Sequence, residues 1–226
     1  MRVYGKNVAL EVIRKESVLK AYVSFNFKNK DIIDALKEKK VKINFLDKSV
    51  IDKMEKNSQG IILEIDDYNY YNLDDIDDEV IVMLDHLEDP HNFGAIIRTV
   101  EAAGYNSIII PKDRSVKVNS TVVKVSTGTI ENVKIVRVNN LVETIKKLKN
   151  KGYWIIGTDM VGEDYKHIDY SGKIVIVIGN EGKGMSRLVR ENCDFTACIP
   201  MRGKVNSLNA SVAASIVLFE AVKKRV

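Results

Sequence analysis

Apolar runs alternate with helical patterns along the whole chain, and the character of these runs changes near residue 80. Before it, short predicted strands at residues 21–25, 41–46 and 60–65 alternate with predicted helices at residues 6–15, 30–39 and 49–56. After it, the predicted strands are apolar at nearly every position, at residues 80–84, 107–110, 133–136, 154–157, 174–178 and 197–199. Strands buried on both faces have this pattern, so the second part is predicted to be an α/β domain with a parallel sheet.

The segment between these two parts is strongly acidic. Residues 67–79 (DYNYYNLDDIDDE) show no clear helical period and precede the first fully apolar strand. Such a segment is typical of a linker. We therefore expect a small α/β domain at residues 1–66, a linker at 67–79, and a larger α/β domain at 80–226.

The distribution of charge bears on what the protein binds. The net charge is only +4, but residues 1–56 hold fourteen Lys and Arg against eight Asp and Glu. A basic lobe is typical of phosphate-backbone binding, although a solvated lysine-rich face accounts for the charge equally well. There is no apolar run of roughly 18 residues and no signal-peptide pattern, so we expect a cytoplasmic protein outside membranes. Cys193 and Cys198 form no ligand set with histidine, so no metal is predicted and both are interpreted as core residues.

Three short polar segments each lie where an apolar strand stops and a helix begins. They read PHNFGAIIR at residues 90–98, GNEGKG at 179–184 and NSLNAS at 206–211. In a parallel α/β sheet the ligand crevice lies beyond the carboxyl ends of the strands. The three segments are therefore predicted to form the walls of one site.

The glycine-rich segment does not match the common nucleotide-binding motifs. Its order is G-x-x-G-x-G, whereas the dinucleotide fingerprint is G-x-G-x-x-G. Met185 stands where a P-loop needs lysine. A nicotinamide enzyme and an ATPase are both disfavoured, and what remains is a turn whose glycines let the backbone approach a ligand closely.

Together, DPHNFGAIIRT (89–99), IGNEGKGMS (178–186) and IPMRGKVNSLNASVA (199–213) resemble the three ordered motifs of the SpoU (TrmH-like) branch of the SPOUT methyltransferases. The resemblance implies a ribosomal-protein-like substrate-binding domain followed by a catalytic domain with a C-terminal trefoil knot. It also implies a homodimer that completes each RNA site across its interface, with S-adenosyl-L-methionine as the methyl donor. Gly179, Ile199 and Leu208 match cofactor-contacting positions of the family, with Thr158 as a fourth. Without the motifs, Ile199 and Leu208 would be interpreted as core residues.

The resemblance assigns Arg98 to the ribose hydroxyl. A guanidinium is effectively never deprotonated, so our hypothesis is that Arg98 binds the nucleotide's phosphate and hydroxyl and favours alkoxide character. Asn92 is expected to orient Arg98 and also to cap the helix that it begins. Glu181, Ser207 and Asn209 match positions that hold Arg98 and the substrate phosphate, while Ser207 and Asn209 alternatively cap the last helix, predicted at residues 209–224.

Two histidines, His86 and His91, lie near Arg98 in sequence. His91 is interpreted as part of the motif scaffold and His86 as a solvated loop residue, although a neutral imidazole is a better proton acceptor than arginine.

Shorter segments narrow the expected substrate. Tyr4-Gly5, Gln59-Gly60-Ile61, PKDRS at residues 111–115 and FEA at residues 219–221 resemble the family members that methylate a guanosine of the 23S rRNA peptidyl-transferase loop. The alternatives are a tRNA ribose methyltransferase and a non-catalytic RNA-binding relative of the same fold. Intact Asn92, Arg98 and Glu181 favour an active enzyme.

Overall fold

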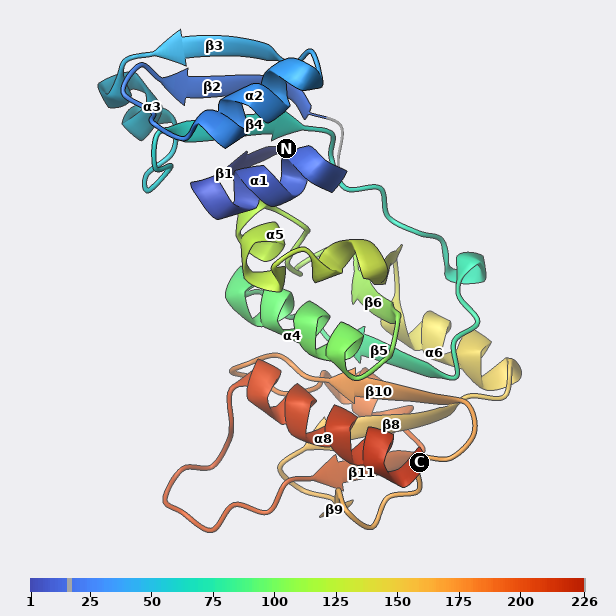
Figure 1. Ribbon diagram of the computed structural model, residues 1–226. Helices are drawn as coiled ribbons and strands as arrows, with labels where there is room; N and C mark the ends of the chain where they lie inside the picture. The colour runs from blue at the N-terminus through green and yellow to red at the C-terminus, as the bar shows by residue number, and fades with distance from the viewer. Residues whose placement is uncertain (16–17, 226) are drawn as a thin grey trace. The chain divides into compact units, whose positions relative to one another are not determined.

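The predicted apolar runs form two separate sheets in the computed structural model, which describes residues 1–15 and 18–225 (Figure 1). Contacts between Cα atoms divide these residues into two units. The first contains residues up to 69 together with 118–128, and the second contains residues 70–117 and 129–225. The predicted domain boundaries at 66 and 80 stay a prediction.

The first unit has a four-stranded sheet in the order β1-β4-β2-β3. Its strands are β1 (Arg2–Tyr4), β2 (Val18–Ser24), β3 (Lys42–Leu46) and β4 (Ile61–Ile65). Strand β4 is antiparallel to β1 and β2, and β2 is parallel to β3. The helices of the unit are α1 (Lys6–Lys15), α2 (Lys30–Glu38), α3 (Lys48–Met54) and α5 (Ser120–Ser126). The prediction omitted β1 because three residues are too few to show an alternating pattern.

The second unit has a seven-stranded sheet in the order β7-β6-β5-β10-β8-β11-β9, and every pairing in it is parallel. The strands are β5 (Val80–Leu84), β6 (Ser107–Pro111), β7 (Lys134–Val138), β8 (Trp154–Asp159), β9 (Glu163–Asp164), β10 (Ile174–Ile178) and β11 (Phe195–Cys198). The predicted parallel sheet is therefore confirmed, with β9 as an added edge strand of two residues.

Helices cover both faces of this sheet. They are α4 (Pro90–Ala102), α6 (Leu141–Asn150), α7 (Arg187–Glu191) and α8 (Ala210–Arg225), with 3₁₀ helices at Leu73–Asp75 and Thr129–Asn132. Helices α4 and α8 pack against each other, and α8 also packs on β10 (Figure 1). On the other face, Ile145 of α6 and Val189 of α7 share one buried cluster with Met83 and Val177. Because both faces are covered, β5 and β10 are buried at all five positions, which explains their unbroken apolar sequence.

The acidic segment is held on the second unit from Tyr70 onward. The backbone N–H of Tyr71 donates to the carbonyl of Ile135 at 2.9 Å, and Ile76 lies in the core. Its carboxylates pair with basic side chains of the same unit, in the pairs Asp74–Lys151, Asp77–Lys173 and Glu79–Arg225. The acidic residues thus have a structural role as partners of lysines and an arginine at the ends of helices and strands of the same unit. The trefoil knot stays a prediction.

Candidate active site

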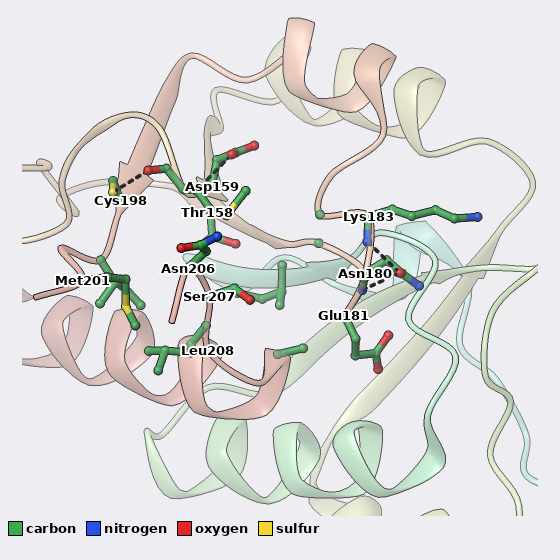
Figure 2. A pocket seen from close by; sticks show the side chains of 18 of the residues that line it. Thr158, Asp159, Asn180, Glu181, Lys183, Cys198, Met201, Asn206, Ser207 and Leu208 are labelled. Atoms are coloured by element: carbon green, nitrogen blue, oxygen red, sulfur yellow. Dashed lines mark hydrogen bonds between the residues drawn. The ribbon is translucent and has the colours of Figure 1, made fainter. Parts of the chain in front are cut away.

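A cavity of about 770 Å³ opens at the carboxyl ends of three adjacent strands, β10, β8 and β11 (Figure 2). Three chain segments line it: the end of β8 from Thr158, the glycine-rich turn after β10, and the long segment after β11 that leads to α8. This is the position where parallel α/β sheets bind ligands, and the volume is that of a small-molecule site. Two of the three predicted walls therefore line one pocket.

The glycine-rich turn is closed by its own backbone. Asn180 and Gly184 exchange two backbone hydrogen bonds of 2.9 Å, and the Asn180 side-chain oxygen accepts from the N–H groups of Gly182 and Lys183. A Cβ on Gly179 would lie 2.5 Å from the carbonyl carbon of Gly184 and 2.5 Å from the nitrogen of Met185. Any side chain at position 179 would thus push the turn open, so the closed turn requires glycine at this position.

The segment after β5 fixes the turn from the neighbouring strand. The Asn180 amide donates to the carbonyl of His86 at 2.8 Å. The buried Asp85 carboxylate accepts from the backbone N–H of Ser186 at 2.5 Å and contacts the His86 ring nitrogen Nδ1 at 2.6 Å. The interpretation of His86 as a solvated loop residue is therefore wrong in part, because its half-buried ring is paired with Asp85.

A polar network joins all three predicted segments. The Asn92 amide donates to the Glu181 carboxylate at 3.0 Å. The Ser211 hydroxyl lies 3.3 Å from the Asn92 side-chain oxygen and 2.6 Å from that of Asn209. In Figure 2 the Glu181 side chain leaves the turn toward α4, away from Thr158. The first segment thus contributes to the site through Glu181 rather than by lining the cavity.

Asn92 does not cap helix α4. The cap is Asp89, whose carboxylate accepts from the backbone N–H of His91 at 2.9 Å, and Pro90 occupies the first turn. Proline suits the first helical position because its missing N–H has no helical partner to lose, so the helix begins before Asn92. This frees the amide of Asn92, which is 6% exposed, for Glu181.

Arg98 lies on the exposed surface of α4 and is not among the residues that line the cavity. Within residues 1–15 and 18–225 its guanidinium makes no hydrogen bond or ion pair. The alternative in which Arg98 serves as an ion-pair partner on the helix surface therefore receives no support, and its assigned role stays a prediction.

All four predicted cofactor positions line the cavity: Thr158, Gly179, Ile199 and Leu208. Ile199 and Leu208 are half-buried, as expected of side chains that cover a ligand, and the Thr158 hydroxyl donates to the carbonyl of Val177 at 2.9 Å. Ser207 also lines the cavity and is exposed. Asn209 lies beside it, and its side chain accepts from the N–H of Ser211 at 2.9 Å, which confirms its capping position at the start of α8.

Four further residues line the cavity: Asp159, Met160, Met201 and Asn206. Met201 and Asn206 lie within the third motif, which gave them no individual role, whereas sequence reasoning missed Asp159 and Met160. Asp159 is nearly buried and forms an ion pair with Arg190. A signal for it was present, since Asp159 follows the apolar run 154–157 as a polar residue at a strand end. The third motif contains Met201 but does not show its role, because the conformation of the segment after β11 decides whether this side chain faces the cavity.

These residues fit a nucleoside that carries a positively charged sulfur. Ile199, Met201 and Leu208 offer apolar surface for a base, and the turn offers backbone N–H and C=O groups for its edge. The lining holds two acidic and two basic residues, with Asp159 paired to Arg190, so its charges balance and the apolar surface and the turn carry the fit. Within the described residues no cluster of His, Cys, Asp and Glu is suited to a metal ion, and no helix there is long and apolar enough to span a membrane.

Fold and site together define a two-unit α/β protein whose parallel-sheet unit binds a small ligand beyond its strand ends. Comparison with protein families makes this class specific. The model of the SpoU rRNA methylase family matches residues 79–219, and the model of the RNA 2′-O ribose methyltransferase substrate-binding domain matches residues 2–71. The chain belongs to the SpoU methylase family, which consists of RNA methyltransferases that use S-adenosylmethionine.

Similar proteins cover nearly the whole chain. A putative TrmH family tRNA/rRNA methyltransferase of Bacillus subtilis is 39% identical over 99% of this chain and 95% of its own length. The AdoMet-bound rRNA methyltransferase of Sinorhizobium meliloti is 26% identical, covers 100% of this chain and 87% of its own, and has a TM-score of 0.79. The TrmH/SpoU tRNA modifying enzyme of A. aeolicus is 33% identical, covers 66% of this chain and 76% of its own, and has a TM-score of 0.61.

Proposed function

We propose that this protein methylates the ribose 2′-hydroxyl of a guanosine in the peptidyl-transferase loop of 23S rRNA, with S-adenosylmethionine as donor, and acts as a homodimer. The observation that carries the proposal is the 3.0 Å hydrogen bond between Asn92 and Glu181. It couples the helix of Arg98 to the turn that lines the cavity. A nucleotide-binding helix and a methyl-donor pocket must be coupled in this way for transfer to occur in line.

When bound, S-adenosylmethionine supplies a methyl group on a positively charged sulfur. Gly179 would let the turn approach the edge of the ligand's base, and Ile199, Leu208 and Thr158 would line the space that holds it. Arg98 would bind the nucleotide's phosphate and stabilise negative charge on the 2′-oxygen. The proton of the hydroxyl would pass to solvent water, and the new O–C bond would replace the donor's methyl–sulfur bond, which leaves a neutral thioether. The positions that hold Arg98 and the substrate phosphate would be Glu181, Ser207 and Asn209.

The rRNA target is favoured over tRNA by how much of the chain each relative covers. The S. meliloti rRNA methyltransferase matches 100% of this chain, whereas the A. aeolicus tRNA modifying enzyme matches 66%. The difference is about the size of the region that matches the substrate-binding model, residues 2–71. A separate substrate-binding unit contributes to the choice of RNA. A relative that matches this unit as well as the catalytic unit therefore supports rRNA as the substrate class of this protein.

The homodimer is part of the proposal because Arg98 is exposed and does not line the cavity of its own subunit. On α4 it lies about 9 Å along the axis and about 120° around it from Asn92, the residue that contacts Glu181. An arginine displaced in this way serves a second subunit's site more readily than its own. We therefore propose that Arg98 acts at the partner's cavity.

Mapping of 2′-O-methylation in 23S rRNA and tRNA, with and without the protein, tests the substrate. The proposal expects one protein-dependent guanosine in the peptidyl-transferase loop. Arg98→Ala should abolish it, whereas Arg187→Ala, a control at an exposed arginine paired with Glu191, should not. Methylation of tRNA alone would refute the rRNA target. Absence of both transfer and S-adenosylmethionine binding would refute the enzyme.

Mixed dimers test the position of Arg98. Arg98→Ala and Leu208→Arg are each expected to be inactive, the first without the arginine and the second without a cofactor pocket. Random mixing makes half of the dimers mixed, and if Arg98 acts across the interface each mixed dimer regains one intact site. Activity should then return to about a quarter of the wild-type level. If the mixture stays inactive while subunits exchange, Arg98 does not act at the partner's site.

A further inference from the structure

Two phenylalanines of the first unit are exposed and stacked on one another. Phe25 is 66% exposed and Phe45 is 46% exposed, and their ring centroids lie 6.2 Å apart with 21° between the ring planes. Phenylalanine is ordinarily among the most buried residue types. A nearly parallel pair of exposed rings at one end of a small sheet is therefore a candidate binding surface.

The backbone fixes this pair in place. Phe45 lies on the edge strand β3, opposite Val23 of β2. Phe25 follows β2 directly, and its N–H donates to the carbonyl of Leu46 at 3.1 Å. A tight turn closes behind it, with the N–H of Phe27 donating to the carbonyl of Ser24 at 2.9 Å. Phe45 shares the face of its strand partner Val23, and Phe25 stacks on Phe45 from the turn after β2. The two rings therefore extend the apolar surface of Val23 into solvent.

Positive charge surrounds the pair along the chain. Lys28 lies three residues after Phe25 and Lys48 lies three residues after Phe45, and both lysines are exposed. Lys42 is also exposed, but it lies on the opposite face of β3 from Phe45. In the part of the chain that the structure describes, the ammonium groups of Lys28 and Lys48 make no ion pair or hydrogen bond. Asp47 is the nearest acid in sequence, and its carboxylate makes no capping hydrogen bond to α3. The lysines are thus available to a phosphate backbone.

We propose that Phe25 and Phe45 form a stacking platform for an unpaired nucleobase of the substrate RNA. This inference rests on the proposed function insofar as it takes RNA to be the substrate. Flat aromatic faces beside lysines are how proteins hold single-stranded nucleotides, because every base has a face that stacks. Two rings are too small a surface for a stable protein interface, which buries about 800 Å² on each partner. The substrate-binding model that matches residues 2–71 includes both rings.

If the platform exists, the protein binds unpaired RNA more tightly than duplex RNA, and this preference depends on the rings of Phe25 and Phe45. Affinity of the full-length protein would be measured for three RNAs: a transcript of the peptidyl-transferase loop, an oligoadenylate of about 12 nucleotides, and a duplex of equal length. Phe25→Ala and Phe45→Ala should each weaken binding of the first two by about 5- to 150-fold and leave the duplex nearly unchanged. Phe45→Tyr should retain affinity and Phe45→Leu should lose it, since leucine keeps apolar bulk without a π-face.

Leu19→Ala is the matched control, because Leu19 is another exposed apolar residue of the same sheet, 57% exposed on β2. It should bind all three RNAs like the wild type. A direct signature comes from Phe45→Trp in a Trp154→Phe background, in which position 45 carries the chain's single tryptophan. Oligoadenylate should quench its fluorescence, and the duplex should not.

The outcomes separate this inference from the proposed function. If the chain fails to methylate RNA, oligoadenylate binding and quenching still report the platform. If methylation occurs and the ring variants raise KM for the transcript while kcat and S-adenosylmethionine affinity stay unchanged, both proposals are supported. If Phe25→Ala and Phe45→Ala fold with wild-type melting temperature and bind oligoadenylate and transcript like the wild type, the platform is refuted.

Discussion

Replacing Gly179 by alanine tests whether the turn after β10 shapes the cofactor site. The added Cβ would lie 2.5 Å from both the Gly184 carbonyl carbon and the Met185 nitrogen. Ordinary carbon contacts begin near 3.5 Å, so these atoms must separate by about 1 Å. Both are backbone atoms, so no side chain can rotate away to relieve the overlap, and the turn itself must move.

Overpacking of this kind costs about 1–3 kcal/mol. The movement strains the two 2.9 Å hydrogen bonds between Asn180 and Gly184, which set the shape of the cavity wall. If the whole cost appears in binding, S-adenosylmethionine affinity falls by about 5- to 150-fold. Any part that appears in folding instead lowers the melting temperature by about 2–4 °C per kcal/mol. The sum of the two effects should therefore reach at least about 1 kcal/mol.

The matched control is Gly182→Ala in the same turn. A Cβ there meets no atom closer than the Asn180 side-chain oxygen at 3.9 Å, and Gly182 does not have positive φ. This variant should bind S-adenosylmethionine within about twofold of the wild type, since surface changes usually cost less than about 0.5 kcal/mol. Calorimetric titration and thermal melting measure both quantities. The reasoning is wrong if Gly179→Ala keeps wild-type affinity and stability, or if Gly182→Ala loses as much.

Three further predictions follow from particular contacts. Asn92→Ala and Glu181→Ala remove the two ends of one hydrogen bond, so a double-mutant cycle on S-adenosylmethionine affinity should show coupling of about 1–2 kcal/mol, whereas additive effects would show that the contact does not couple the two segments. Burial raises the pKa of Cys193 to about 12, so at about pH 8 mass mapping should find its thiol unmodified by iodoacetamide in the folded protein; rapid alkylation would contradict this burial. A hydrogen bond from Lys173 lowers the pKa of Asp77, so the pair stabilises the fold above the ordinary carboxyl pKa and loses that effect as pH falls through the lowered value. The small melting-temperature difference between wild type and Asp77→Asn should therefore persist from about pH 7 down to about pH 4 and shrink only as the pH falls further; a difference that grows on acidification would contradict this sign.

The parallel sheet could be predicted from sequence because strands buried on both faces are apolar at every position. Strands β5 and β10 are apolar at every position, and no amphipathic pattern imitates five such residues between polar turns. Strands β1 and β9, of three and two residues, leave no comparable record and were missed. Their pairing is set by neighbours far along the chain rather than by local pattern.

The site was predictable in its composition but not in its connections. Polar residues after apolar strands pointed to the right turns, and the same rule would have found Asp159. The hydrogen bonds that hold the glycine-rich turn were not predictable in this way. Asp85 and His86 reach the turn only because β5 lies beside β10 in the sheet. Strand order is a property of the whole fold, and one sequence does not state it. The misplaced helix cap had a local signal, because Asp89-Pro90 marks the start of α4.

The buried position of Asn92 explains why an amide is needed at this junction. Its nitrogen donates to the Glu181 carboxylate, and its oxygen lies within reach of the Ser211 hydroxyl. A carboxylate in its place would offer Glu181 a second negative charge at hydrogen-bond distance, where like charges disfavour one another. An apolar residue would leave both partners without this contact. An amide provides one donor and one acceptor on opposite sides, so a single neutral side chain links α4, the glycine-rich turn and the start of α8.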